Sequence, residues 1–444
     1  MSLLVPKQRL NAILALGLPI IGGMISQSIL NLVDTAMVGS LGEDALAGVG
    51  IGSYANFMAV ALVMGLSSGV QAMVARRKGE EQFSNMATPL NGALLLAAAI
   101  GIPLVLFFFS FAPELIALLN NTEAVQQVAT PYFEYRSFAI LAVGLNFSFR
   151  GYWNGINRSV VYLRTLVIMH VCNVIISYGL IFGHFGLPEM GAPGAGLGTT
   201  IALYIGSLVY AYITIMEGKE HGFMRGLPDK QTMATMLRLS IPNSLQQFFF
   251  ASSFAVLFWI IGQVGVQETA VAHVLINLAL FLILPGVGFG MAATTLVSEA
   301  LGRKEPADAY RWGWDVVKVA TCILAILGIP MWLMPEYILS IFIRDQALIE
   351  LGVTPLRITG MAIALDAAAL VFTQALLGAG ANKTVMKINI IAQWGFFLPA
   401  AWLIGPYFGF GLLAIWLVQF IQRGGSSLIF AIMWRRKHWI HIKL

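Results

Sequence analysis

The chain has 444 residues, of which 58% are hydrophobic and only 11% are charged. Soluble domains carry about a quarter charged residues, so this composition excludes an ordinary soluble protein and predicts one that crosses a lipid bilayer several times. The net charge of +5 could indicate a nucleic-acid partner. Basic loops on the cytoplasmic side of a membrane explain it better, and no nucleic acid is expected.

Apolar runs long enough to cross a bilayer recur along the whole chain. In chain order they lie near residues 10–38, 46–75, 88–110, 128–152, 160–182, 196–216, 235–261, 272–300, 311–333, 353–378, 385–405 and 411–434. The runs are continuously apolar rather than alternating, which excludes a β-barrel. We therefore predict an all-α integral membrane protein with twelve transmembrane helices.

The loops between these runs divide by charge. One set, joined by both termini, is basic, as at Arg76, Arg77 and Lys78, whereas the opposite set is acidic, as at Glu43 and Asp44. The positive-inside rule then places both termini in the cytoplasm.

The two halves of the chain resemble each other at a spacing of about 224 residues. Pro19 matches Pro242, and Thr130-Pro131 matches Thr354-Pro355. Six helices per half is an even number, so the copies share one orientation and form a parallel repeat. We predict two six-helix lobes, residues 1–217 and 235–444, joined by a cytoplasmic linker at 218–234, with substrate passing between the lobes.

One carboxylate, Asp34, lies deep within the first apolar run. An ionisable group at that depth is costly and marks a candidate functional site. The repeat aligns it with Leu257, so the C-terminal lobe has no matching acid. Helical spacing brings further polar residues of the first, fifth and sixth helices toward the same outer half of the N-terminal lobe. They are Gln27, Asn31, His170, Asn173, Ser177, Thr199 and Thr200.

Two interpretations of Asp34 stay open. As a proton site it would take up a proton on the acidic outer side and release it inside, because burial disfavours the charged form. As a structural residue it would hydrogen-bond Asn173 across a helix interface. Gly17 and Pro19 interrupt the same helix, either as a hinge that bends when Asp34 changes protonation or as a static kink.

Asp366, in the tenth helix, is the second deeply buried acid. It is either a possible second site, for an ion or a substrate cation, or the partner of a neighbouring glutamine such as Gln246, Gln247 or Gln374. Arg136, near an outer helix end, is expected to snorkel to the interface.

Four apolar residues are candidates to line a substrate pocket that adapts to different molecules, and ordinary packing is the alternative. They are Met24, Met58, Met64 and Phe147. Motifs for hydrolytic, ATP-binding or metal-binding chemistry are absent from the sequence, so no catalytic residue, metal or cofactor is expected.

Three colinear segments resemble the multidrug and toxic compound extrusion (MATE) family. They are LPIIGGMISQSILNLVDTAMVGSLGEDALAGVG, RGYWNGINRS and QALLGAGANKT. Asp34 with Asn173, and no acid in the seventh helix, resembles the DinF-like prokaryotic branch. The resemblance implies a proton site in the N-terminal lobe, with Asp34, Asn173 and Pro19 in the family's positions. Ser177 stands where some relatives have a further aspartate, and the helix-seven glutamate of sodium-coupled relatives is missing, which favours protons as the coupling ion.

We expect a monomeric, proton-coupled antiporter in the inner membrane of a prokaryote. It would export diverse, mostly apolar organic cations by alternating access, with protonation of Asp34 rearranging the N-terminal lobe and releasing the drug. Alternatives are a sodium-coupled antiporter and a lipid-linked-oligosaccharide flippase, although flippases usually line their cavity with several basic residues, which we expect this chain to lack at depth. A membrane-embedded lipid enzyme is a further alternative, for which His170 and Asp34 are the only candidate residues.

Overall fold

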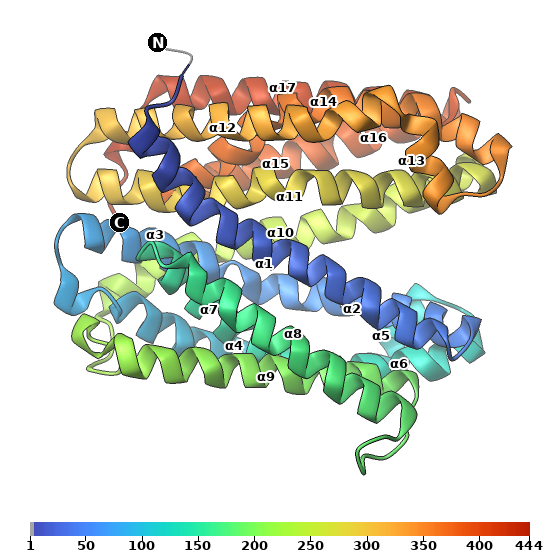
Figure 1. The fold of residues 1–444 in the computed structure, drawn as a ribbon, viewed down its shortest axis with the longest axis horizontal. Coiled ribbons are helices and arrows are strands. Elements are labelled where there is room, and N and C mark those ends of the chain that lie inside the picture. Colours follow the sequence, from blue (N-terminus) through green and yellow to red (C-terminus); the bar gives the residue numbers. More distant parts are fainter. Residues whose placement is uncertain (1–3) are drawn as a thin grey trace. The chain divides into compact units, whose positions relative to one another are not determined.

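The computed structural model describes residues 4–444, and every regular element in that range is a helix (Figure 1). The first half contains α1 (Lys7–Gly39), α2 (Glu43–Met64), α3 (Leu66–Gly79), η1 (Phe83–Asn85), α4 (Thr88–Ser110), α5 (Ala112–Leu119), α6 (Glu123–Ser137), α7 (Ala139–Gly155), α8 (Ser159–Phe182), α9 (Ala192–Glu217) and η2 (Lys219–His221).

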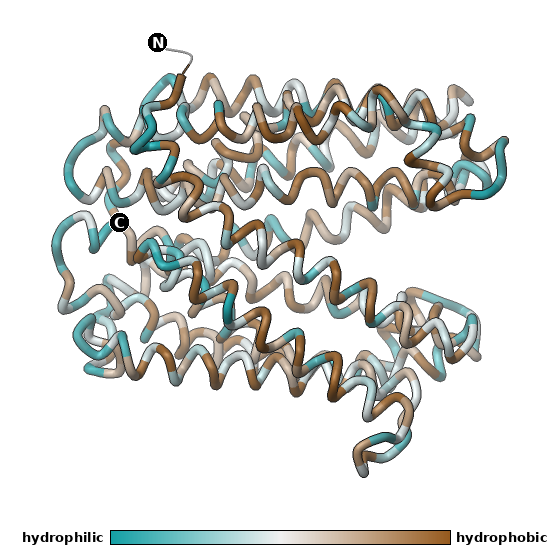
Figure 2. The backbone as a smooth tube through the Cα atoms, viewed as in Figure 1, coloured by the Kyte–Doolittle hydropathy of each residue, from teal (hydrophilic) through white to brown (hydrophobic). Residues whose placement is uncertain are grey.

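The second half follows a similar plan. It contains α10 (Lys230–Val264), α11 (Val266–Gly302), α12 (Pro306–Leu333), α13 (Pro335–Phe342), α14 (Gln346–Ala379), α15 (Asn382–Ile390), η3 (Ile391–Phe397), α16 (Leu398–Trp402), η4 (Leu403–Tyr407), α17 (Gly411–Arg436) and η5 (His438–His441). It has single long helices, α11 and α14, where the first half has the pairs α2 with α3 and α6 with α7. Hydrophobic residues follow the middle of the helices, and hydrophilic residues gather in the connecting loops (Figure 2).

The all-helical membrane fold is confirmed. Within residues 4–444, eleven helical stretches are long and apolar enough to span a membrane. The difference from twelve predicted spans lies at 128–152, where α6 and α7 are separate helices on either side of Phe138. Each piece is short, and α6 carries Glu123, Glu134 and Arg136, so neither is a membrane-length apolar helix by itself.

Two short helices outside the predicted spans show the internal repeat directly. Helices α5 and α13 have eight residues each, follow α4 and α12, and have a proline in their first turn. A Pro-Glu pair lies in the first turn of both, at Pro113-Glu114 and at Pro335-Glu336. Proline fits the first helical turn because its missing N–H would be unpaired there in any case. The two halves therefore share elements that hydropathy alone does not reveal.

Contacts divide the described chain into two compact units. The N-terminal unit is Gly22–Phe248, and the C-terminal unit joins residues 4–21 to Phe249–Leu444. Helix α1 therefore contributes its first part to one unit and its second part to the other. Contact grouping follows packing, whereas the predicted lobes 1–217 and 235–444 follow the sequence repeat, so those lobes stay a prediction.

A glycine lies between α2 and α3, which together form the second span of the N-terminal unit. A side chain at Gly65 would begin 2.2 Å from the Ser240 carbonyl oxygen, so only glycine allows α10 to pass this closely. The Gly65 N–H donates to the Ser244 hydroxyl at 3.0 Å, and Asn243 Nδ2 donates to Ser68 Oγ at 2.7 Å. The division between α2 and α3 thus follows from the close approach of α10.

The linker after α9 is held by the N-terminal unit. Asn91 of α4 donates to the carbonyl oxygens of Gly222 and Gly226 and accepts from the Met224 N–H. At its end, Asp229 accepts from the Thr232 N–H at 3.3 Å, and hydrogen bonding from the Thr232 side chain lowers the pKa of this carboxyl group. The linker is therefore a docked segment that ends in a helix cap.

The C-terminal unit is organised around α14, which packs against α11, α12 and α17 (Figure 1). The first part of α1 is attached to the same unit by close packing. A side chain at Gly17 would begin 2.7 Å from the Phe289 ring, and one at Gly288 would begin 2.5 Å from Ile21. These contacts need glycine because the two helices meet without space for a Cβ atom.

Ion pairs attach the N-terminal end of α1 to helix α12 in this unit. Arg9 bonds to Asp308 and to Asp315, each at 2.6 Å, and its guanidinium lies 3.6 Å from the centre of the Trp312 ring. Arg303 also pairs with Asp308, at 3.2 Å. The Arg9 side chain is only 19% exposed, so this cluster is shielded more than a surface ion pair.

Replacement of Arg9 tests this attachment. Arg9→Ala removes both ion pairs and the ring contact, and it leaves two partly buried carboxylates less compensated. We expect the free energy of unfolding of the solubilised protein to fall by roughly 2–3 kcal/mol. Thermal unfolding of Arg9→Ala beside Lys7→Ala, an exposed basic residue two positions earlier, measures this difference. Equal midpoints for the two variants would contradict it.

Candidate functional site

Asp34 lies in the second part of α1, and one of its carboxylate oxygens is buried without a partner. Oδ1 has no hydrogen bond, although the residue as a whole is only half-buried. Buried polar atoms are nearly always bonded, so an unbonded carboxylate oxygen requires an explanation. A group that must gain and lose a proton is one such explanation.

The charge that acts on Asp34 comes from Arg136 of α6. This guanidinium is itself incompletely bonded, since Nε and Nη1 are buried without partners. When the Asn56 amide is turned so that both of its polar atoms are bonded, the amide oxygen of Asn56 accepts a hydrogen bond from Arg136 Nη2 at 2.8 Å. The expectation that Arg136 snorkels to the interface is wrong, because these two nitrogens are turned into the protein. Its role was missed because the sequence shows only its position near a helix end.

His170 connects α8 to α1. Its Nδ1 lies 2.7 Å from Ser26 Oγ, and its Nε2 lies 3.1 Å from Gln27 Oε1. Gln27 Nε2 in turn donates to Asn31 Oδ1 at 3.1 Å. The predicted polar face of α1 is thus partly satisfied by one histidine, whose side chain is buried.

Asn173 belongs to a second polar group between α8 and α9. Its Oδ1 accepts from Ser177 Oγ at 2.7 Å, and its Nδ2 donates to Thr199 Oγ1 at 3.3 Å. Thr200 instead donates to the Tyr135 carbonyl oxygen at 2.9 Å. Both polar atoms of Asn173 are therefore engaged away from Asp34.

The structure thus separates the predicted polar cluster into three parts. Ser26, His170, Gln27 and Asn31 form one chain of bonds, Thr199, Asn173 and Ser177 form another, and Asp34 has no bond to Asn173 through its buried oxygen. The alternative in which Asp34 is a structural partner of Asn173 is therefore not the arrangement found.

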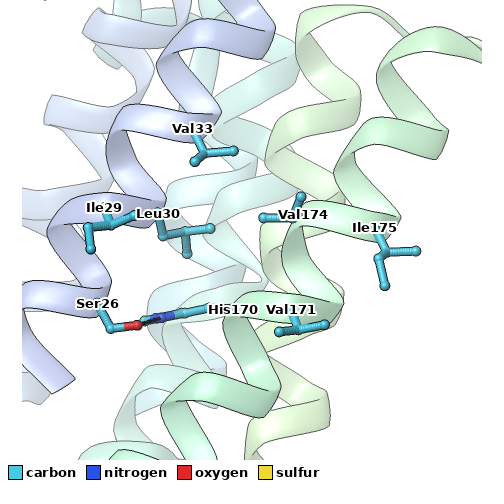
Figure 3. Close-up of a pocket in the computed structure, with 8 residues that line it drawn as sticks. All are labelled: Ser26, Ile29, Leu30, Val33, His170, Val171, Val174 and Ile175. Carbon is cyan, nitrogen blue, oxygen red and sulfur yellow. Dashed lines mark hydrogen bonds between the residues drawn. The ribbon is translucent and has the colours of Figure 1, made fainter. Parts of the chain in front are cut away.

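An open groove of about 290 Å³ lies between α1 and α8 (Figure 3). Ser26 and His170 meet at one end of it, and the rest of the lining is aliphatic (Figure 3). The lining consists of Ser26, Ile29, Leu30, Val33, His170, Val171, Val174 and Ile175. Ile29, Val171 and Ile175 are each more than half exposed, so the groove is an open apolar surface of two membrane-spanning helices. None of the four predicted lining residues contributes to it.

Those four residues lie elsewhere in the N-terminal unit. Met24, Met58, Met64 and Phe147 are half-buried. Met64 and Phe147 pack on the core cluster that contains Val63, Phe133 and Ile140, and the Arg150 guanidinium lies 3.9 Å from the centre of the Phe147 ring. This packing supports the structural interpretation of Met64 and Phe147.

The predicted hinge residues do not interrupt α1 here. The helix continues from Lys7 to Gly39 with Pro19 inside it. Gly17 has a packing role against Phe289. Pro19 lies two residues before the point at which α1 passes from one unit to the other. Bending at this point during transport stays a prediction.

Asp366 has an ion-pair partner in α17. Arg423 of α17 donates to Asp366 Oδ2 at 2.5 Å, and the Asp366 side chain is 6% exposed. The proposed glutamine partners are therefore wrong. Arg423 is one basic residue at depth, near the middle of α17 and roughly 18 Å from its start. A single arginine in an apolar helix was the available signal.

The fold and these sites define a multi-pass membrane protein with a duplicated helical plan and isolated polar groups within its spans. The chain belongs to the multidrug and toxic compound extrusion family, whose model, MatE, matches residues 19–179 and again 242–403. It is thus a multidrug efflux transporter rather than an enzyme. Both matches begin at the helix prolines, Pro19 and Pro242, which supports the alignment of the two halves.

Curated relatives cover nearly the whole chain. The probable multidrug resistance protein NorM of Brucella suis is 28% identical over 440 residues, covering 97% of this chain and 93% of the relative. The probable multidrug resistance protein NorM of Thermotoga maritima is 27% identical over 442 residues, covering 96% and 92%.

Solved structures share the fold. A multidrug resistance MATE family transporter in an outward-facing conformation matches with a TM-score of 0.90 and 19% identity, covering 98% of this chain and 97% of that one. A MOP superfamily transporter from Pyrococcus furiosus matches with a TM-score of 0.88 and 20% identity, covering 98% and 97%.

The bonds of Asn173 give a test of the α8–α9 interface. Asn173→Ala leaves the buried Ser177 hydroxyl without its acceptor, so we expect unfolding to become easier by roughly 1–3 kcal/mol. Cys172→Ala, at the neighbouring half-buried position of α8, is the matched control. Thermal unfolding of both variants measures the effect, and a loss as large in Cys172→Ala would contradict the assignment.

Proposed function

We propose that this transporter exchanges protons for drugs and that Asp34 is its proton site. The observation that carries the proposal is the difference between the two intramembrane acids. Asp366 is compensated by a bonded guanidinium, whereas Asp34 Oδ1 is buried and unbonded. A carboxyl group without a fixed partner can change its protonation at less structural cost than one inside an ion pair.

The proposed cycle uses the two parts of α1. A proton entering from outside neutralises Asp34 and removes its attraction to Arg136. The second part of α1 then repacks against α8, and the drug leaves to the outside. Release of the proton to the cytoplasm restores the charge. The residues Gln27, Asn31, His170, Asn173, Ser177, Thr199 and Thr200 support this rearrangement through the bonds that hold α1, α8 and α9.

The remaining parts of the proposal concern substrate and setting. Substrates are diverse, mostly apolar cations, and the protein acts as a monomer in the inner membrane of a prokaryote, with both termini in the cytoplasm and no cofactor besides the proton. Placement in the DinF-like branch belongs to the same proposal. Basic loops on one side of the predicted spans support the orientation.

Transport in proteoliposomes tests the proton site. We expect dye efflux driven by an imposed proton gradient in the wild type and a loss of at least about tenfold in Asp34→Asn, which keeps the shape but cannot ionise. Asp44→Asn, at an exposed acid near the start of α2, is the matched control and should keep wild-type rates.

The same vesicles separate the alternatives. Efflux driven by a sodium gradient and unaffected by Asp34→Asn would overturn the proposal in favour of sodium coupling. Absence of drug movement under either gradient, with movement of a lipid-linked oligosaccharide instead, would favour a flippase.

A further inference from the structure

One face of α8 is apolar and exposed. Val167, Val171 and Ile175 are 46%, 55% and 53% exposed, whereas polar residues of the same helix, among them His170 and Asn173, are buried. Lipid tails are as apolar as these exposed side chains, and a water-filled path through a membrane would be lined by polar groups instead. This face of α8 therefore meets the hydrocarbon of the bilayer.

Helix α1 borders this face and leaves a groove beside it. A side chain at Gly23 would begin 2.6 Å from the Tyr162 ring, and Ser26 Oγ lies 2.7 Å from His170 Nδ1. Beyond these two contacts, residues within 29–33 of α1 and 171–175 of α8 line the open groove (Figure 3). A drug site encloses most of the surface of its ligand, which an open groove does not do. A lipid acyl chain, which is apolar and reaches the groove from the bilayer, fits it better.

Arg164 interrupts the apolar face of α8. It lies seven positions before Val171 and eleven before Ile175, and both spacings are close to whole helical turns. Its side chain is exposed, and within the described part of the chain it forms no hydrogen bond or ion pair. Arg158, at the start of the same helix, is by contrast paired with Glu217. An unpaired guanidinium at an apolar surface extends toward the headgroup layer, where phosphate groups match its geometry.

We propose that Arg164 and the groove between α1 and α8 form a binding site for an anionic phospholipid. The guanidinium binds the phosphate, and one acyl chain follows α8 into the groove. The lipid belongs to the leaflet in which α8 begins, which the predicted orientation makes the cytoplasmic one. A zwitterionic lipid fits less well, because its ammonium group would be repelled by the guanidinium.

The dimensions agree with this placement. Along the helix, Arg164 is about 10 Å from Val171 and about 16 Å from Ile175. The hydrocarbon of one leaflet is roughly 15 Å thick, half of that of the bilayer. An acyl chain whose phosphate is held at Arg164 therefore reaches the groove. The site requires neither Asp34 nor a transported drug, so the binding claim is independent of the proposed antiport.

Photolabelling of the full-length protein in phosphatidylcholine nanodiscs tests the site. The probe is a trace of phosphatidylglycerol with a diazirine in the distal part of one acyl chain, and the labelled positions are mapped by peptide mass spectrometry. We expect label within 29–33 and 171–175 at a higher level than on the other spans. Arg164→Gln should lower this label about fivefold, which is the usual effect of one basic residue at an anionic lipid surface.

Two further variants separate the charge from the groove. Lys383→Gln removes an exposed basic residue at the start of α15 and should leave the label unchanged. Val171→Trp keeps Arg164 but fills the groove, so label within 29–33 should fall as far as in Arg164→Gln. Both Arg164 and Val171 are exposed, so the variants should fold, and thermal unfolding checks this.

Each outcome decides the proposal. Equal label in the groove from a phosphatidylcholine probe with the same chain shows unselective lipid contact and overturns the anionic site. Unchanged label in Arg164→Gln, or an equal loss in Lys383→Gln, overturns the role of Arg164. Label on α8 without label on α1 overturns the groove as the place of the acyl chain. A selective phosphatidylglycerol label that is lost in Arg164→Gln and in Val171→Trp supports the site.

Discussion

Hydrocarbon provides no hydrogen bonds, so every polar group inside the membrane depends on a partner within the protein. This constraint explains much of the structure. His170 is bonded through both ring nitrogens, Asn173 through both amide atoms, and Asp366 through an arginine. The unbonded Oδ1 of Asp34 is one of several buried polar atoms without a partner in the described part of the chain, and among these atoms it is the one that belongs to a carboxylate.

The membrane fold could largely be predicted from sequence, because the requirement for about 20 apolar residues per span leaves a strong local signal. What could not be predicted depends on contacts between distant segments. The break at Gly65 follows from the approach of Ser240 and Ser244, 175 or more residues away. The separation of α6 from α7 and the short helices α5 and α13 also left no clear hydropathy signal.

The candidate site also has features that could be predicted from the sequence and features that could not. Helical periodicity places Gln27 and Asn31 on one face, and the structure bonds them to each other. Periodicity says nothing of which helices face each other, so the pairing of Asp366 with Arg423, 57 positions apart, could not be deduced. The inward turn of Arg136 was missed for the same reason. A hydrogen bond between two helices depends on the tertiary structure, and the residues on either helix do not indicate which partner they meet.

Helix α1 is attached to one unit by its first part and to the other unit by residues from its midpoint onward. Arg9 and Gly17 hold its first part to α12 and α11. At its second part, His170 bonds to Ser26, and Gly23 admits Tyr162 at a distance that no side chain would allow. Pro19, between the anchors, cannot donate a backbone hydrogen bond to Ala15. A force that pulls the two parts of α1 apart would therefore act on a turn that lacks one of its backbone hydrogen bonds.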